Sequence, residues 1–152
     1  MLKNHLIKYI IFIFFVAFFY LSPFKIIIVQ GQSMFPTLND KQILLGMTTN
    51  KYNIGDVVVA KVEGDLIIKR IKYKEGDEIY NLINDKLELP IIITKENYEN
   101  HKKTKFEIVQ KLTIEKNRFY LLGDNPNQSD DSRRFGSVSL DSIKYKIIFP
   151  RL

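Results

Sequence analysis

The 152-residue chain contains no cysteine and no tryptophan, and it has only two histidines, His5 and His101. The absence of cysteine excludes disulfides and thiolate metal sites. No set of histidines and carboxylates has the spacing of a metal site, so we predict neither a metal nor another cofactor. His5 precedes a long apolar run and His101 lies in a charged, loop-like segment, which leaves a Ser-His-Asp triad without support.

The chain also lacks internal repeats, low-complexity tracts and, beyond its first 29 residues, any long stretch with helical periodicity. Short runs of β-branched and aromatic residues instead alternate with Gly-Asp turns. We therefore predict an all-β, antiparallel, barrel-like domain, with the polar segment 95–105 as a loop or small insertion. The best strand candidates are Ile43–Leu45, Val57–Ala60, Leu66–Ile68, Ile91–Ile93, Phe119–Leu122 and Tyr145–Phe149.

One long uncharged run, Tyr9–Phe24, precedes this domain. A membrane-spanning helix needs ~20 apolar residues. The run reaches that length, toward residues 6 and 29, if Lys8 and Lys25 extend to the two membrane interfaces. A cleavable signal peptide is the alternative, but the bulky segment Phe18–Leu21 offers no small residues for a cleavage site. The pattern therefore predicts one retained transmembrane helix.

Charge indicates the orientation and the partner of this anchor. Lys3 and Lys8 precede the apolar run, and basic flanks stay in the cytoplasm. We expect residues 1–29 to form a cytoplasmic tip and single-pass anchor in the cell membrane, and residues 30–152 to form an extracytoplasmic domain. The net charge of +6 suits nucleic acid or anionic lipid. With an anchor present, we expect the lipid bilayer as partner and no nucleic acid.

A candidate nucleophile lies just beyond the anchor. Ser33 sits two residues after Gly31 and three before Pro36, on backbone that neither a helix nor a central strand accepts easily. A serine hydroxyl is a weak nucleophile unless a base lies within hydrogen-bond reach. Because no histidine is suitably placed, we consider a lysine, which activates serine on several unrelated folds.

The segment Leu66–Ile71 supplies the candidate base, Lys69. If the segment is a strand, alternation places Lys69 on the same face as Ile67 and Ile71. Apolar surroundings lower the pKa of a lysine, and a neutral amine could take the proton of Ser33. A lone lysine between isoleucines is also typical of an edge strand with an outward side chain, so the pattern alone leaves both interpretations open.

The polar segment Gly123–Gly136 brings hydroxyls, acids and arginines together. Turn chemistry alone accounts for much of this composition. The same groups could also support a buried amine: Ser129 could hydrogen-bond the lysine, and Asp131 could pair with Arg133 or with Arg70. The segment is therefore either a plain loop between strands or part of a site.

Together these stretches resemble type I signal peptidases, the membrane-bound serine proteases of the S26 family that remove signal peptides from exported proteins. Four motifs occur in the family's order: Gly31-x-Ser33-Met34-x-Pro36-Thr37-Leu38, Gly55-Asp56-Val57-Val58-Val59, Lys69-Arg70, and Gly123-Asp124-Asn125-x-x-x-Ser129-x-Asp131-Ser132-Arg133-x-x-Gly136. The similarity covers nearly the whole chain beyond the anchor. Only about fifty residues separate the last two motifs, so we expect a minimal accessory β region.

The resemblance implies a Ser/Lys serine endopeptidase that acts on signal-peptide-bearing pre-proteins with small residues at positions −1 and −3. Gly31 stands where some members carry an oxyanion-binding serine, so the Ser33 backbone N–H is the expected oxyanion donor. The implied roles are nucleophile for Ser33, general base for Lys69, lysine-positioning hydroxyl for Ser129, and loop organisation for Asp131 and Arg133.

Three alternatives remain at this point. The chain could be a specialised relative that matures a pilin or conjugation protein. It could be a non-catalytic anchored module that binds peptides, which the presence of both Ser33 and Lys69 disfavours. A self-cleaving repressor uses similar chemistry but needs a DNA-binding helix-turn-helix where this chain has its apolar run.

Overall fold

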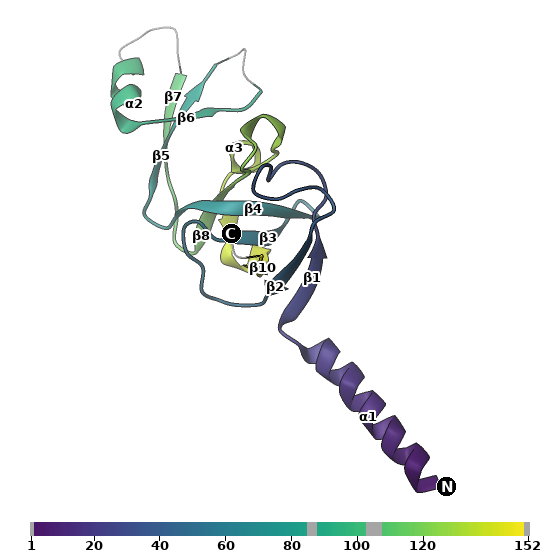
Figure 1. Cartoon of the computed structure of the whole chain (residues 1–152). Coiled ribbons are helices and arrows are strands. Elements are labelled where there is room, and N and C mark those ends of the chain that lie inside the picture. Colours follow the sequence, from purple (N-terminus) through teal and green to yellow (C-terminus); the bar gives the residue numbers. More distant parts are fainter. Residues whose placement is uncertain (1, 85–87, 103–107, 151–152) are drawn as a thin grey trace.

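The computed structural model describes residues 2–84, 88–102 and 108–150 of the chain. A seven-stranded antiparallel sheet in the order β1-β2-β10-β3-β4-β8-β9 forms the main body, and a three-stranded sheet in the order β6-β5-β7 projects from it (Figure 1). The prediction of an antiparallel β domain is therefore confirmed. The main strands are β1 (Phe24–Ile28), β2 (Ile43–Met47), β3 (Val57–Val62), β4 (Asp65–Lys74), β8 (Arg118–Leu122), β9 (Val138–Ser139) and β10 (Ile143–Phe149).

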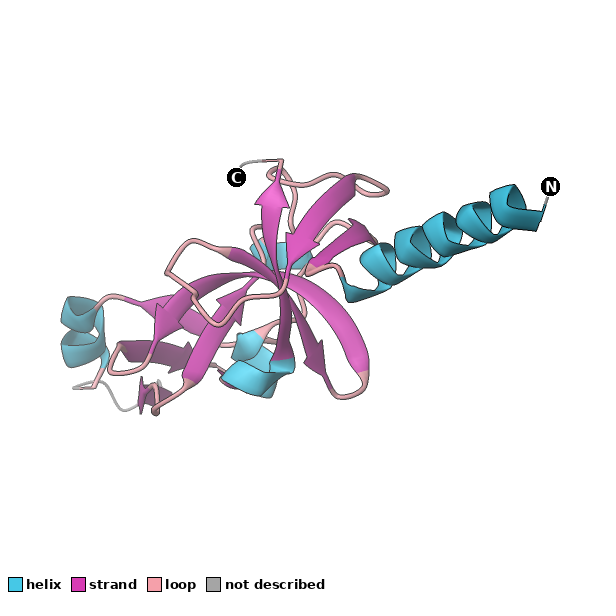
Figure 2. Cartoon of the chain, turned by 90° about the horizontal axis from the view of Figure 1, so that it is seen from below, coloured by secondary structure: helices cyan, strands magenta, loops and turns pink. Residues whose placement is uncertain are grey.

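The N-terminal helix α1 (Leu2–Leu21) extends away from the sheets (Figure 2). The helix ends one residue before Ser22-Pro23, because proline disfavours helical backbone in the residue before it, here Ser22. The Ser22 hydroxyl accepts the Phe24 N–H at 3.2 Å, and β1 begins there. In the part of the chain that the structure describes, no helix has both the length and the apolar character that a membrane crossing requires.

The sequence prediction placed residues 24–28 in the apolar anchor, and this part of the prediction is wrong. These residues form the edge strand β1, which pairs with β2 from Phe24 opposite Met47 to Ile28 opposite Ile43. β-Branched side chains suit a half-buried strand as well as they suit lipid, so hydropathy alone does not separate the two. The domain boundary predicted at residue 29 thus falls after the first strand of the sheet.

Strand β4 is the longest strand and has two partners. Its first half pairs with β3, from Val62 opposite Asp65 to Val57 opposite Arg70, whereas β8 pairs with residues 70–74. In the described chain, residues 65–69 therefore pair along one edge only. Two apolar clusters hold the sheet together, one around Leu38 and Leu44 and the other around Val58 and Leu121, all at most 1% exposed.

The small sheet consists of β5 (Glu78–Ile83), β6 (Ile91–Ile93) and β7 (Ile108–Thr113), and it carries the helix α2 (Lys95–His101). The chain leaves the main sheet after Lys74 and returns at Arg118, next to Phe119, which lies opposite Lys74. The segment 95–105, predicted as a loop or insertion, contributes α2, and residues 103–105 lie outside the described residues. Strands β5 and β7 were not predicted.

Candidate active site

Ser33 lies in the loop between β1 and β2. Gly31, with a φ of 85°, makes the turn that leaves β1, and its N–H donates to the Asp40 carboxylate at 2.9 Å. Met34 and Leu38 are buried in the core beneath the loop. A buried residue directly after Ser33 fixes the backbone there, so the hydroxyl has a defined position at the end of β1.

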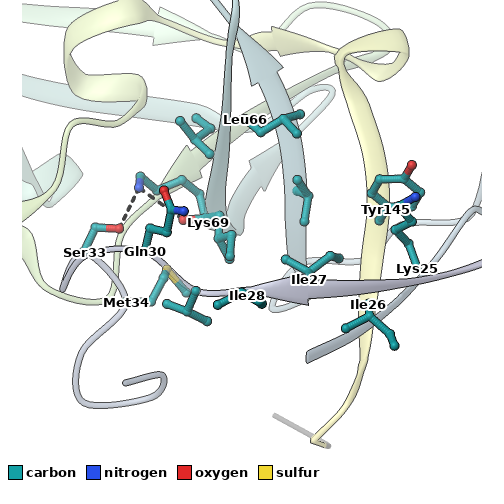
Figure 3. Close-up of a pocket in the computed structure, with 14 residues that line it drawn as sticks. Lys25, Ile26, Ile27, Ile28, Gln30, Ser33, Met34, Leu66, Lys69 and Tyr145 are labelled. Atoms are coloured by element: carbon teal, nitrogen blue, oxygen red, sulfur yellow. Dashed lines mark hydrogen bonds between the residues drawn. The ribbon is translucent and has the colours of Figure 1, made fainter. Parts of the chain in front are cut away.

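Lys69 lies on β4 and reaches this hydroxyl. Its Nζ donates to Ser33 Oγ at 2.8 Å and to the Ile68 carbonyl at 3.1 Å, and only 4% of the residue is exposed (Figure 3). The alternative of an outward-facing lysine is therefore wrong. Burial lowers the pKa of Lys69 from its ordinary value, and the charges of Asp131 and Asp130 oppose this shift only in part.

Arg70 pairs with Asp124 and not with Asp131, the partner that the sequence analysis considered. Its guanidinium forms a two-pronged pair with Asp124, with Nη2 to Oδ2 at 2.7 Å, and Nη1 donates to the Gly55 carbonyl at 2.7 Å. Burial opposes the ionised carboxylate, but the hydrogen bonds from Arg70 and Thr37 and the positive charges of Arg70 and Lys72 together outweigh it and hold the pKa of Asp124 below its usual value. Arg70 thus links β4 to the start of the Gly123–Gly136 segment.

Asp131 pairs with Arg133, which was one of the two partners, Arg133 and Arg70, that the sequence analysis considered. The Asp131 carboxylate is fully buried and accepts Arg133 Nε at 2.9 Å, Arg133 Nη2 at 3.0 Å and the Gly123 N–H at 3.1 Å. It also caps the short helix α3 (Ser132–Phe135). Burial alone would raise the pKa of Asp131, but these hydrogen bonds reverse the shift and lower it. The carboxylate therefore fastens the segment to the end of β8.

Ser129 is brought close to Ser33, but not in the way expected. It is 6% exposed, and its Oγ makes no hydrogen bond of normal geometry among the described residues, although it lies near enough to the Asp131 carboxylate to help lower the pKa of that group. The expected hydrogen bond to the Lys69 amine is not formed. A Cβ at Gly123 would lie 2.0 Å from Ser129 Oγ and 2.6 Å from the Ser33 carbonyl oxygen. Only glycine at this position lets the two serines flank the same backbone.

Asn125 is a site residue that the sequence reasoning missed. Its N–H donates to the Ser33 carbonyl at 3.0 Å, and its side-chain amide donates to the Gln32 carbonyl at 3.1 Å. The only signal in the sequence was its place in the Gly123-Asp124-Asn125 motif. These bonds connect the segment that follows β8 directly to the loop that carries Ser33.

A groove of about 570 Å³ begins at Ser33 and Lys69 and runs along the sheet. Residues 25–30, which include most of β1, form one side, and residues 66–69 of β4 form the other. Both strand segments have an edge that is unpaired in the described part of the chain. An extended peptide could therefore add to the sheet here. Across the described residues, no group of three or more His, Asp or Glu side chains could hold a metal ion.

Comparison with known proteins decides the family. The family profile described as "Signal peptidase, peptidase S26" matches residues 2–151. The chain belongs to this family. Relatives of this S26 family member include signal peptidase IB of Staphylococcus aureus, which is 31% identical over an alignment of 176 positions that covers 97% of this chain and 90% of that protein.

Two further relatives of this S26 family member come from a bacterium and a yeast. Signal peptidase I S of Bacillus subtilis is 30% identical over 119 residues, which cover 70% of this chain and 64% of that protein. Mitochondrial inner membrane protease subunit 1 of Schizosaccharomyces pombe is 32% identical over an alignment of 134 positions, which covers 82% of this chain and 71% of that protein. The resemblance inferred from the four motifs is thus confirmed at the level of the family.

Proposed function

We propose that this protein is a serine endopeptidase that removes N-terminal signal peptides from exported pre-proteins with a Ser33/Lys69 dyad. One observation carries the proposal: a buried amine with a lowered pKa lies 2.8 Å from a serine hydroxyl at the end of a peptide-sized groove. Membership of the signal peptidase family supports the same substrate class.

In the proposed reaction, the neutral Lys69 amine takes the Ser33 Oγ proton while Oγ attacks the scissile carbonyl carbon. The tetrahedral intermediate collapses to an acyl-enzyme, and the Lys69 ammonium protonates the leaving amine. Lys69 then deprotonates the water that attacks the ester, and its ammonium returns the proton to Ser33 Oγ as the acyl group leaves. The Ser33 N–H, which donates no hydrogen bond within the described residues, is the proposed oxyanion donor.

The surrounding residues hold this pair in place. Asp131 and Arg133 fix the segment that carries Ser129, and Arg70 ties the same segment to β4 through Asp124. We propose that the Ser129 hydroxyl, which is buried and makes no hydrogen bond of normal geometry among the described residues, hydrogen-bonds the Lys69 amine once substrate occupies the groove. Such contacts often tighten only in the substrate complex.

The groove explains how a pre-protein would bind. An extended segment hydrogen-bonds to the free edges of β1 and β4, and its alternate side chains point toward the groove floor. Val29, Met34 and Ile68 form apolar surface next to Ser33. Shallow apolar surface at this end favours small side chains at positions −1 and −3 over large or charged ones.

The dyad predicts how activity depends on pH. Because the ammonium form of Lys69 cannot act as a base, kcat/KM should rise with pH up to the lowered pKa of Lys69 and level off above it. Below that pKa, one titrating group gives about a tenfold rise per pH unit. A pH series of kcat/KM with one peptide measures this. A profile that falls from pH 6 to 9 would contradict Lys69 as the base.

The proposed activity is tested with an internally quenched peptide that carries an Ala-x-Ala site. The full chain in detergent should cleave after the second alanine, and Ser33→Ala should abolish cleavage without loss of the β-sheet circular dichroism signal. Tight binding with no cleavage by the wild-type chain would favour the non-catalytic peptide-binding module. Cleavage of only one class of pre-protein would indicate the specialised relative.

We further propose that the residues before β1 hold the protein at the cell membrane, with the N-terminus cytoplasmic and the β domain extracytoplasmic. The apolar side chains of α1 from Ile7 to Val16, where described, are 48–74% exposed and need a cover. In a flotation assay, the full chain should remain bound to liposomes in high salt. Recovery of the protein in the lipid-free fraction would overturn the proposed attachment.

A further inference from the structure

The groove ends in two polar side chains, although most of its lining is apolar. Lys25 of β1 and Tyr145 of β10 line it at the end opposite to Ser33 and Lys69 (Figure 3). Neither side chain takes part in the dyad or in the network around Asp131. Their position in the groove therefore calls for a function of its own.

The strand register places Lys25 on the groove side of β1. Lys25 lies opposite Gly46 of β2, so the two residues share a face of the sheet. Phe24, Ile26 and Ile28 alternate with Lys25 and are exposed on the other face of the strand, from which Ile26 and Ile28 border the groove only along the strand's free edge. The Lys25 ammonium is thus directed away from the apolar outer face of β1, which is the face suited to lipid.

Gly46 explains why Tyr145 can lie at the same end. A Cβ at Gly46 would lie 2.6 Å from Ile27 Cδ1 and 3.0 Å from Tyr145 Cβ, so these two side chains pack over the bare glycine. Ile27 and Tyr145 both contact the cluster around Leu44 and line the groove. The Tyr145 ring is therefore anchored in the core, next to the strand position that carries Lys25.

The Lys25 ammonium and the Tyr145 hydroxyl are both available to bind a ligand. Within the described residues, neither the Lys25 ammonium nor the Tyr145 hydroxyl has a hydrogen-bond or ion-pair partner, whereas Lys146, the next residue along β10, pairs with Asp56 at 2.7 Å. An ammonium and a phenol at the end of an apolar groove are donors suited to a carboxylate or an amide oxygen.

We infer that Lys25 and Tyr145 form an upstream subsite that selects an acidic or amide side chain of the substrate and rejects a basic one. This inference rests on the proposed peptidase function. Gln30, five positions along the chain from Lys25, lines the groove beside Ser33. At ~3.3 Å per residue, a peptide strand alongside β1 would place its fifth or sixth residue before the cleaved bond at this subsite.

The test uses a set of internally quenched peptides that share one Ala-x-Ala site and differ only at the fifth and sixth residues before the cut, which are Glu, Gln, Ala or Lys. The wild-type chain should cleave the Glu peptide about fivefold faster than the Lys peptide in kcat/KM, the size of one partly exposed ion pair. Lys25→Ala should remove this ratio and Lys25→Glu should invert it. Tyr145→Phe should lower kcat/KM for the Gln peptide relative to the Ala peptide.

Lys51→Ala is the matched control, because Lys51 is exposed in the loop after β2 and does not line the groove. Its peptide ratios should equal those of the wild type. Equal rates for all peptides with the wild type, or equal effects of Lys25→Glu on all of them, would overturn the inference. Loss of binding to phosphatidylglycerol vesicles in Lys25→Glu with unchanged peptide ratios would assign Lys25 to lipid and overturn it as well.

The failure of the proposed function would look different. In that case the wild type would cleave no peptide, and the same series is then measured as binding of fluorescent peptides to the wild-type chain. A Glu over Lys preference in affinity that Lys25→Glu inverts would support the subsite without catalysis. Absence of a charge preference, or of binding, would contradict it.

Discussion

Replacement of Lys69 by methionine should lower kcat/KM for an Ala-x-Ala peptide by ~10³-fold or more while the protein remains folded. Positioned general bases contribute about 10²–10⁴-fold, and the loss of the base also removes the partner that orients Ser33 Oγ. Methionine has nearly the length of lysine and fills the same apolar space. It also avoids burial of a charge, so the melting temperature should equal or exceed that of the wild type.

Lys61→Met on β3 provides the control for this experiment, since Lys61 is exposed and follows a similar alternation of valines. Lys61→Met should keep kcat/KM within about twofold of the wild-type value, because an exposed lysine away from the site contributes little to activity or stability. Continuous peptide cleavage and thermal unfolding of both variants measure the two effects separately. A Lys69→Met protein with near wild-type kcat/KM would show that another group deprotonates Ser33.

Replacement of Asp131 by alanine should lower the free energy of unfolding by about 3 kcal/mol, the cost of breaking a buried ion pair. The change leaves Arg133 unpaired on its buried side and removes the acceptor of the Gly123 N–H. It also removes the cap of α3. Because Gly123 lies against Ser33 and Ser129, peptide cleavage should fall as well. Urea unfolding monitored by tyrosine fluorescence measures the stability change.

Asp130→Ala is the matched control, because Asp130 is the neighbouring acid but its side chain is 61% exposed and pairs with Arg134 at the surface. Its effect should stay below about 1 kcal/mol. If the two variants were equally stable, the buried pair would not hold the segment.

The pKa of Asp131 adds a pH dependence to the same comparison. A lowered pKa in the folded state means that the carboxylate stabilises the protein above its unfolded pKa, near 3.9, and that this contribution is lost as the pH falls through the folded pKa. The wild-type chain should therefore lose stability on acidification by more than Asp131→Ala does. Unfolding curves at pH 7 and about pH 3 measure this difference.

Much of the main sheet could be predicted, because its strands are short β-branched runs separated by glycine turns. All six strand candidates fall within β2, β3, β4, β6, β8 and β10. Strand β1 could not be recognised, because four of its five residues are apolar and continue the apolar run of the helix before them. Strands β5 and β7 contain polar residues such as Asn81 and Gln110 that weaken the strand pattern.

The pairing of Ser33 with Lys69 was predictable because few other bases exist in the chain, and the 2.8 Å contact between them agrees with it. The partners in the loop were harder to assign. Composition could not decide between Arg70 and Arg133 for Asp131, since the choice depends on the register of β4 with β8. Asn125 acts mostly through its backbone N–H, which every residue except proline has, so its identity carried little information.

The excursion between Lys74 and Phe119 has a consequence for how this architecture varies. These two residues lie opposite each other across β4 and β8, so the chain leaves and re-enters the main sheet at one point. Among the described residues, one small apolar cluster joins the two sheets: Ile79 and Ile114 are buried against Tyr120, and Ile92 and Leu112 of the small sheet pack against them. Insertions or deletions near α2 would leave the strand pairing around the serine untouched. The length of the chain can therefore vary in this insertion, in evolution or by engineering, while the arrangement of Ser33 and Lys69 stays the same.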